Sequence, residues 1–352
     1  MRLGKLSDSI LKRTVLKQIK KRRSEIISGA GIGEDCAIFA LPGDKFATCV
    51  VEYTVKDRQD MIRAIYKSTN NLATAGAEPV AVMLSIILPE RASEEKLKKL
   101  MAGAAQAAAE LNIQIAGGHT TVSKYVSEKL AVVTAYGTYA QTEADGGDAA
   151  HAGKGKDEVQ TLKTVDAGKV YTTKGAKPGQ DIVISKWIGL EGTAMLASLK
   201  KEEMLARYPE YLIDEAAGFD KYLSVIPEAA TAMKSGVCVM HDASEGGIMA
   251  TLWELAESSG VGLHIDLKKL PIRQETVEVC EFCDVNPYEL LSGGCLVMTA
   301  EDGNALVRAL EEQNIPAVVV GKITDSNDRI IVNGEEKRYL DKPKTDEILR
   351  FR

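Results

Sequence analysis

The order of apolar and polar residues divides the chain into a regular succession of predicted strands and helices. In the first half, continuous apolar runs predict strands, and apolar residues at helical spacing predict helices. The strands are expected at 45–51, 80–88, 113–116 and 130–139, and the helices at 7–23 and 60–75. Gly76 and Pro79 end the second of these helices, and Ser93 caps a further long helix. This alternation predicts an α/β architecture.

The second half, from about Gly168, has the same rhythm. Strands are expected at 182–185, 237–240, 261–265 and 317–320, and helices at 191–200, 248–259, 273–283 and 303–313. The stretch 141–164 differs, because it is polar and rich in glycine, and it predicts a mobile loop or insertion. We therefore expect an N-terminal domain at 1–140, a linker at 141–167 and a C-terminal domain at 168–345.

The composition is that of an ordinary globular protein. The chain has 352 residues, more than one core usually serves, with 45% hydrophobic and 27% charged residues. A net charge of −6 argues against general nucleic-acid binding, and no apolar run is long enough to span a bilayer. Because the first residues lack the apolar stretch of a secretory signal, we expect a cytoplasmic protein without a membrane or nucleic-acid partner.

Two further patterns have alternative interpretations. Six scattered cysteines fit reduced core residues, and only Cys280 and Cys283 have the CxxC spacing of zinc and redox sites. That pair lies in a predicted helix, without a second CxxC or a nearby histidine pair. The basic run 20–23 is either a solvated helix face or a surface for an acidic partner or phosphate.

The stretch 29–39 combines three glycines with two acidic residues before an apolar run. Glycine lets the backbone approach a ligand closely, and amides exposed in such a turn can bind anionic oxygens. Glu34 and Asp35 have the oxygen ligands that a hard cation prefers. The turn is therefore either a magnesium–phosphate site or a strand-entry turn with solvated acids, and a short glycine pattern does not decide between them.

Polar residues stand beside glycines at three predicted strand ends. Asp35 follows the first glycine turn, and His119 follows a Gly-Gly pair. Asp242 and Glu245 precede a second Gly-Gly pair, where Asp242 or Ser244 is alternatively a simple cap for the next helix. Because ligand sites in α/β proteins commonly lie at such strand ends, the three together favour one ligand site.

Five segments follow one another along the chain: 31–37 (GIGEDCA), 70–79 (NNLATAGAEP), 117–120 (GGHT), 175–179 (GAKPG) and 241–247 (HDASEGG). In this order they resemble the aminoimidazole ribonucleotide (AIR) synthase superfamily, and most of all its HypE-like, AIR synthase-related branch. The superfamily also includes PurM-type cyclo-ligases, thiamine-monophosphate kinase and selenophosphate synthetase. The resemblance covers nearly the whole chain and is more specific for the fold than for the reaction.

The resemblance implies an α/β (α+β) protein with the two-domain PurM-like fold. It implies a homodimer in which the N-terminal domains pair into a β-barrel, with ATP in a nearby cleft and Mg²⁺ on its phosphates. The implied metal ligands are Asp35, Glu52, Asn71 and Glu245. The implied ATP or phosphate contacts are Gly31, Gly33, Gly117, Gly118, Thr120, Asp242 and Gly246. His119 is either the acid–base group or a structural histidine bonded to a neighbouring backbone group.

Two of these positions depart from the family pattern. Asn71 stands where Asp is usual, and His119 stands where many members have Asp. Because magnesium prefers carboxylate and water oxygens, we expect weaker binding of magnesium and ATP than in a fully acidic member. HypE itself ends in a cysteine, whereas this chain ends in Arg352, so the cyanide-forming reaction is not assigned.

Two functions follow as alternatives. The first is an ATP-dependent enzyme of the ligase or kinase type, which phosphorylates or activates an oxygen or amide of a small molecule or a protein terminus. The second is a non-catalytic dimeric scaffold or hydrogenase-maturation partner with a degenerate nucleotide site. Stabilisation by Mg-ATP favours the enzyme, whereas a stable protein partner without a nucleotide response favours the scaffold.

Overall fold

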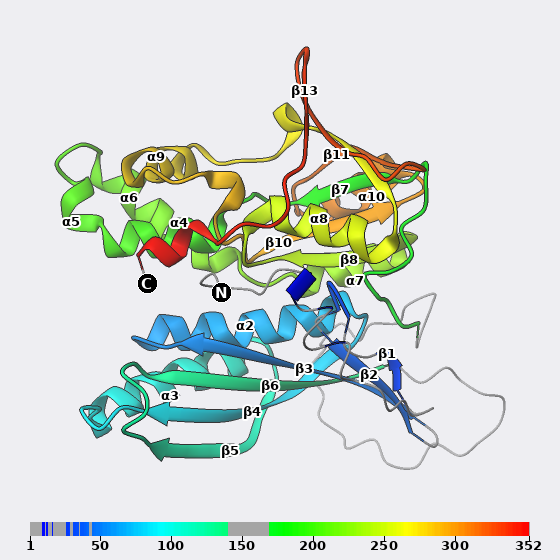
Figure 1. Ribbon diagram of the computed structural model, residues 1–352. Helices are drawn as coiled ribbons and strands as arrows, with labels where there is room; N and C mark the ends of the chain where they lie inside the picture. The colour runs from blue at the N-terminus through cyan, green and yellow to red at the C-terminus, as the bar shows by residue number, and fades with distance from the viewer. Residues whose placement is uncertain are drawn as a thin grey trace.

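Two sheets covered by helices make up the protein, and the two halves lie one above the other (Figure 1). The computed structural model describes residues 9, 10, 12, 16, 26–28, 31–34, 36–41, 44–139 and 169–351. Helix α2, Arg58–Thr74, lies between the first sheet and the second half (Figure 1). The predicted helix at 7–23 falls largely outside the described residues, and the predicted loop at 141–164 falls wholly outside them.

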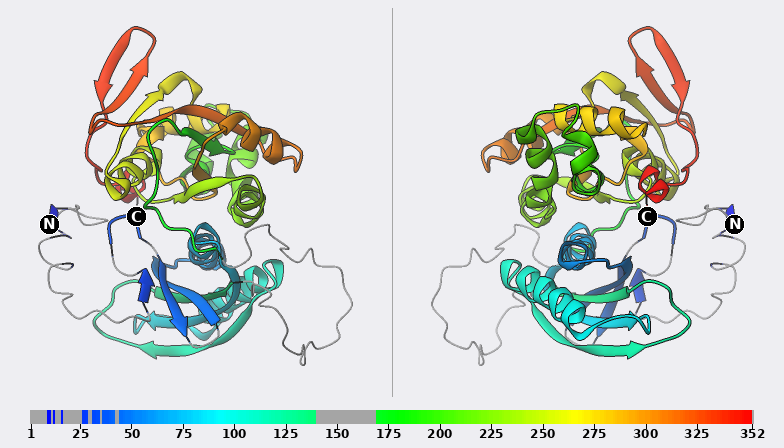
Figure 2. Two further views of the ribbon diagram at one scale, coloured as in Figure 1. Left: turned by 90° about the vertical axis from the view of Figure 1, so that its right-hand side faces the viewer. Right: turned by 90° about the vertical axis from the view of Figure 1, so that its left-hand side faces the viewer.

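Within the described residues, the first sheet has six strands in the order β1-β2-β3-β6-β4-β5. They are β1 (Ile26–Ser28), β2 (Cys36–Leu41), β3 (Asp44–Thr54), β4 (Glu78–Leu88), β5 (Gln114–Val122) and β6 (Leu130–Thr138). All neighbours are antiparallel except β4 and β5. Helices α2 and α3 (Glu94–Glu110) pack on the same face of the sheet and form one core with it (Figure 2).

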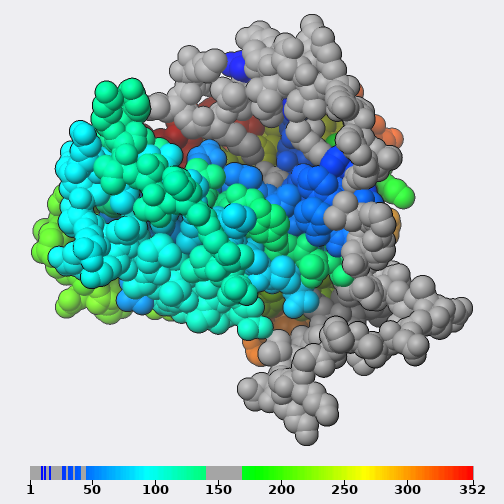
Figure 3. Space-filling view, turned by 90° about the horizontal axis from the view of Figure 1, so that it is seen from below, coloured from blue at the N-terminus to red at the C-terminus, as the bar shows by residue number. Residues whose placement is uncertain are grey.

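The other face of this sheet carries exposed apolar side chains. Side chains of a strand alternate between its two faces, so Cys49 and Tyr53 of β3 are buried towards the helices while Val50 and Glu52 are exposed on the opposite side. Val50 is 59% exposed, and Met83 of β4 is 41% exposed. Figure 3 views the molecule from this side. An apolar sheet face open to solvent is a candidate interface.

In the described range 169–351, the second sheet has seven strands in the order β13-β12-β9-β11-β7-β10-β8. They are β7 (Asp181–Ser185), β8 (Val237–Ala243), β9 (Gly262–Asp266), β10 (Cys295–Ala300), β11 (Ala317–Thr324), β12 (Arg329–Asn333) and β13 (Glu336–Tyr339). All neighbours are antiparallel except β9 and β12.

Helices cover both faces of the second sheet. They are α4 (Leu190–Leu199), α5 (Lys201–Met204), α6 (Glu210–Ala217), α7 (Ile226–Lys234), α8 (Gly247–Ser259), α9 (Gln274–Cys283) and α10 (Gly303–Glu311), with short 3-10 turns between some of them. Ile182 and Ile184 of β7 pack in a core with α8, whereas Val183 packs in another with α7 and α10. The alternation along β7 therefore fixes which helices lie on which face.

Most predicted strands and helices are confirmed with small shifts at their ends, but the end of the strand predicted at 113–116 is wrong. The observed strand β5 continues through the glycines to Val122. Gly118 has φ 148°, and a Cβ there would overlap the carbonyl oxygen of Leu84 on β4. This glycine therefore lets two strands approach closely just after their register shifts between Val82 and Met83, rather than forming a turn at a strand end.

The segment 201–234 and the hairpin β12–β13 had no counterpart among the predicted elements. Cys280 and Cys283 lie in α9 and are buried, and burial raises the pKa of both thiols, as expected of core cysteines. None of the helices within the described ranges is both long enough and apolar enough to cross a bilayer.

Candidate functional site

The glycine turn lies at the entrance to β2, close to α2. Gly31 and Glu34 form an antiparallel bridge, and Ser28 Oγ donates to Glu34 Oε2 at 3.3 Å. Lys174 Nζ, from the segment that leads to β7, lies 3.3 Å from Glu34 Oε1. Asp35, the predicted metal ligand of this turn, lies outside the described residues. The turn thus already joins the two halves through the carboxylate of Glu34.

A small hollow separates the turn from α2. Its lining includes Gly33, Glu34, Asn71 and Thr173, and its volume is about 20 Å³. A cavity of this size accommodates about one water molecule. The structure therefore brings the predicted glycine turn and Asn71 together, but the space between them is too small for a nucleotide in this conformation.

Asn71 also reaches the second half of the chain. With its amide oriented so that both of its ends are satisfied, Nδ2 lies 3.2 Å from Asp242 Oδ1 and 3.2 Å from the carbonyl oxygen of Lys67. Asn71 and Asp242 are both buried, at 6% and 3% exposure. Two predicted site residues, 171 positions apart in the sequence (242 minus 71), are therefore in direct contact.

Lys67 lies one helical turn before Asn71 and pairs with the third predicted residue. Its Nζ donates to Glu245 Oε1 at 2.9 Å. Burial lowers the pKa of the ammonium, but the charge and hydrogen bond of Glu245, with Glu191 and Asp242 nearby, outweigh burial and raise it. Lys67 is therefore a fixed positive charge among three carboxylates at the junction of the two halves.

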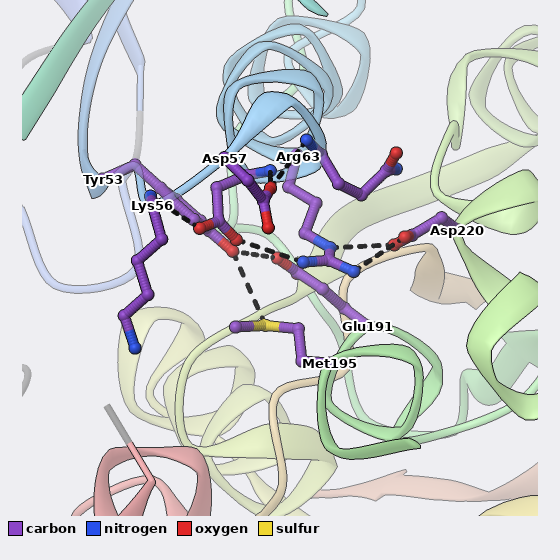
Figure 4. A network of polar contacts seen from close by, with 9 residues as sticks. Tyr53, Lys56, Asp57, Arg63, Glu191, Met195 and Asp220 are labelled. Atoms are coloured by element: carbon purple, nitrogen blue, oxygen red, sulfur yellow. Dashed lines mark hydrogen bonds and ion pairs between the residues drawn. The ribbon is translucent and has the colours of Figure 1, made fainter. Parts of the chain in front are cut away.

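Glu191 at the start of α4 takes part in a separate contact with the first sheet. Tyr53 Oη donates to Glu191 Oε1 at 2.8 Å, and both side chains are buried (Figure 4). Figure 4 also shows Met195, one turn along α4, beside the same hydroxyl. A Cβ at Gly293 would overlap Glu191 Oε2, so only glycine there leaves room for this carboxylate.

Arg63 is the centre of the remaining network in Figure 4. Its guanidinium donates to both oxygens of Asp220, at 2.9 and 2.7 Å, and to Asp60 Oδ1 at 3.1 Å. Burial raises the pKa of Asp220, while the charge of Arg63 opposes that rise. Two turns further along α2, Asn70 donates to the carbonyl oxygen of Leu223 and accepts from the amide of Val225. Helix α2 therefore contacts the second half through a row of buried polar groups.

The C-terminal segment holds the start of α8. The N-cap of α8 is Gly246, without a side-chain hydrogen bond, so the alternative in which Asp242 or Ser244 caps this helix is wrong. Instead, Asp346 Oδ2 accepts from the Gly246 amide at 2.6 Å, and Oδ1 accepts from the amides of Leu291 and Ile348. Burial raises the pKa of Asp346 to about 6, although these three bonds oppose the rise. A carboxylate of the chain itself thus occupies the amide predicted to bind phosphate.

The structure does not bring Glu52 and His119 to this cleft. Glu52 is on the outward face of the first sheet, because the neighbouring Tyr53 takes the inward position. His119 is exposed on β5, at the opposite edge of that sheet from β1, and it pairs with Ser85 of β4. Within one chain these two positions therefore lie away from the cleft, and their roles in the expected homodimer stay a prediction. The same holds for the other predicted phosphate contacts on β5, which are Gly117, Gly118 and Thr120.

The two implied magnesium ligands that the structure describes in this cleft, Asn71 and Glu245, do not form a metal site. Asn71 presents an NH₂ group to Asp242, and Lys67 donates to Glu245. Within the described ranges, no group of three or more His, Cys, Asp or Glu side chains is placed to hold a metal ion. Mg²⁺ requires several oxygen ligands in a near-octahedral arrangement. The donor set of this cleft is therefore that of an ion-paired protein interface.

Three residues of the cleft were not among the predicted site residues. Lys67 could have been found, because residues four apart on a helix share a face and Asn71 was already a candidate. Tyr53 could have been found from the alternation along β3. Nothing in the sequence indicates that Glu191 would approach Gly293.

The chain matches two models of one family. Residues 33–139 match the N-terminal domain of the AIR synthase related proteins, and residues 177–333 match their C-terminal domain. The chain therefore belongs to the AIR synthase-related family and has its two-domain PurM-like fold. This confirms the fold that the five sequence segments imply.

Its relatives include hydrogenase-formation proteins. It is 26% identical over 363 residues to a putative hydrogenase expression/formation protein of Methanocaldococcus jannaschii, covering 99% of this chain and 96% of that protein. It is 30% identical over 252 residues to the carbamoyl dehydratase HypE of Cupriavidus necator, covering 70% of this chain and 62% of that protein. The chain is thus HypE-like within its family.

Solved structures of HypE have the same fold. A chain of a HypE–HypF complex matches with a TM-score of 0.70 at 23% identity, over 95% of this chain and 100% of that one. A hydrogenase maturation protein HypE in complex with ATP matches with a TM-score of 0.67 at 19% identity, over 98% of this chain and 97% of that one.

Proposed function

We propose that the cleft between the two halves binds ATP, and that the protein activates an oxygen or amide of a small molecule or a protein terminus. The observation that best supports this is the convergence of Lys67, Asn71 and Asp242 beside the glycine turn. The similarity to carbamoyl dehydratase HypE, and to a HypE structure in complex with ATP, supports the choice of nucleotide.

In this proposal the residues of the cleft act by position and charge. Lys67 exchanges Glu245 for a phosphate oxygen, since an ammonium is a compact charge with three donors. Asn71 orients the same phosphate through its amide, and the backbone amides of the glycine turn contact it from the other side. Phosphoryl transfer depends largely on positioning and charge neutralisation, so such contacts are sufficient for activation. No step is assigned to magnesium.

Isothermal titration with ATP, with and without MgCl₂, tests this proposal. We compare the native protein with Lys67→Met and with Lys98→Met, whose lysine also makes a 2.9 Å ion pair with a glutamate but is 76% exposed on α3. Native protein and Lys98→Met should bind alike, and Lys67→Met about tenfold more weakly, as for one lost charge-assisted contact. A native protein that does not bind ATP, or equal binding by Lys67→Met, contradicts the proposal.

The scaffold alternative has an observation of its own. Lys67, Tyr53 and Asn71 already have partners in the second half of the chain, and Asp346 occupies the amide of Gly246. A cleft closed in this way needs no nucleotide to hold the halves together. If so, the melting temperature does not respond to ATP, and a maturation factor co-purifies with the protein. The HypE–HypF complex is the precedent for such a protein partner.

We also propose a homodimer that forms through the outward face of the first sheet. Exposed Val50 and Met83 on this face support it. Glu52 lies on the same face, so its predicted ligand role belongs to the dimer rather than to the cleft of one chain. Light scattering should give twice the chain mass of 38.0 kDa, and Val50→Glu should give the monomer. A native monomer contradicts this.

The domain limits and the compartment remain proposals. We propose domains at 1–140 and 168–345 joined by a linker at 141–167, which limited proteolysis within the linker would support. Six free cysteines, five of them buried, support a reducing compartment such as the cytoplasm.

A further inference from the structure

Each carboxylate of the cleft already accepts a hydrogen from a side chain of the first half. Glu245 accepts from the Lys67 ammonium at 2.9 Å, and Glu191 accepts from the Tyr53 hydroxyl at 2.8 Å. Asp242 accepts from the Asn71 amide at 3.2 Å. Three carboxylates of the second half therefore face one ammonium, one hydroxyl and one amide of the first half.

Lys67 supplies a positive charge beside these three carboxylates. A divalent cation at the same carboxylates would lie beside the Lys67 ammonium and be repelled by it. It would also have to break the hydrogen bonds that Tyr53 and Asn71 donate to Glu191 and Asp242, since both side chains present a donor where a cation needs an oxygen lone pair. The fixed charge of Lys67 and the donor end of Asn71 thus act against a metal ion in the same way.

The two residues are coupled by the helix that carries them. Lys67 and Asn71 are four residues apart on α2, so they share the face that meets the second half. The family position that is usually acidic is Asn in this chain, and the position one turn before it supplies a positive charge. Together they place an ammonium and an amide NH₂ group, rather than a carboxylate, on the helix face that meets the acidic residues of the second half.

We propose that the Lys67 ammonium takes the place of a divalent cation at Asp242, Glu245 and Glu191, so that this cluster holds no Mg²⁺ in the native protein. The inference rests on the proposed function only for the statement that the nucleotide binds in this cleft. Its subject is the charge of the cluster, which exists whether or not ATP binds. The cleft then joins the two halves, and meets a phosphate, without a metal at these three residues.

Titration of the nucleotide-free protein with MgCl₂ alone, followed by calorimetry, tests this inference. The variants are Lys67→Met, Asn71→Asp and the double variant, with Lys98→Met as the exposed-pair control. The native protein and the control should bind Mg²⁺ equally weakly. Each single variant should bind about tenfold more tightly and the double variant more tightly still, because one repelling charge is lost and one ligand is gained. Circular dichroism establishes that each variant is folded.

Two results would overturn the inference. One is a native protein that binds Mg²⁺ as tightly as Lys67→Met does, since the lysine would then exclude nothing. The other is a folded double variant that binds no more tightly than the control, since the cluster would then not be a cation position at all. If Lys67→Met does not fold, Asn71→Asp, which nearly preserves side-chain size, decides between the outcomes. Failure to bind ATP contradicts only the proposed function, because no nucleotide is present here.

Discussion

The ion pair of Arg63 with Asp220 offers a direct test of how the two halves are held together. Substitution of Arg63 by Met keeps most of the side-chain volume but removes the guanidinium that donates to both oxygens of Asp220. Arg63 is 5% exposed and the Asp220 side chain 15%, so the variant leaves a carboxylate largely shielded from water without its charged partner. Asp60 also loses a donor but keeps the amide of Lys56 at 2.8 Å.

Removal of one partner from a buried ion pair costs about 3–5 kcal/mol, and we expect the lower end because Asp60 keeps its other donor. The free energy of unfolding, measured in urea at pH 7.5, should fall by about 3 kcal/mol in Arg63→Met. Asp220→Asn removes the carboxylate itself, so adding it to Arg63→Met should recover about 1–2 kcal/mol of that loss.

The pH dependence supplies an internal control. Burial already raises the pKa of Asp220, and the variant loses the arginine that opposes this. A carboxyl whose folded pKa lies above its unfolded value of about 3.9 takes up a proton on folding, so the variant gains stability as the pH falls through the folded pKa. The difference between the native protein and the variant should therefore shrink as the pH falls from 7.5 towards the unfolded value of about 3.9. A loss under about 1 kcal/mol that does not change with pH would refute the reasoning, since it is the value of a surface pair.

Three further predictions concern other contacts. Asp346→Asn should flatten the pH dependence of stability. In the native protein, the folded pKa of Asp346 is raised to about 6, so this group contributes stability that is fully present below about pH 4 and is lost as the pH rises through 6. Urea titrations at these two pH values should show a contribution of about 3 kcal/mol to the free energy of unfolding. An unchanged slope contradicts it. Tyr53→Phe should lower the free energy of unfolding by about 1–3 kcal/mol, because Glu191 loses the donor of a buried bond, and a change within error would count against that contact. Gly118→Ala should lower the melting temperature, because its Cβ would overlap a backbone carbonyl of β4 at a cost of about 1–3 kcal/mol. An unaltered melting temperature would show that the two strands can separate there.

The sequence predicts the fold better than the site, for reasons that individual residues show. Apolar runs and glycine or proline stops are local signals, so most of the strands and helices were found within a few residues, whereas the segment 201–234 and the hairpin β12–β13 were missed. The Gly-Gly pair of β5 was interpreted as the end of a strand, because a glycine can serve either a turn or a close approach of strands. Only the position of Leu84 on the neighbouring strand decides between the two. The alternation along β3 already places Glu52 opposite Tyr53, and applying it would have removed Glu52 from the cleft.

Contacts between the two halves are a different matter. The pairing of Asn71 with Asp242 follows from the family resemblance, and Lys67 follows from Asn71 by helical spacing. The approach of Glu191 to Gly293 and the docking of Asp346 on α8 depend on how the halves and the C-terminal segment pack. Such contacts are set by the tertiary fold and leave no periodic signal in the chain.

The central claim is that nucleotide binds between the two halves, at the glycine turn and the cluster around Lys67. Hydrogen exchange of backbone amides, measured with and without ATP, tests it most directly, because it locates the bound nucleotide along the chain. The account predicts slower exchange at 31–34, around Asn71 and at 242–247, with little change on β12 and β13. Protection confined to other segments, or no protection at saturating ATP, would contradict it.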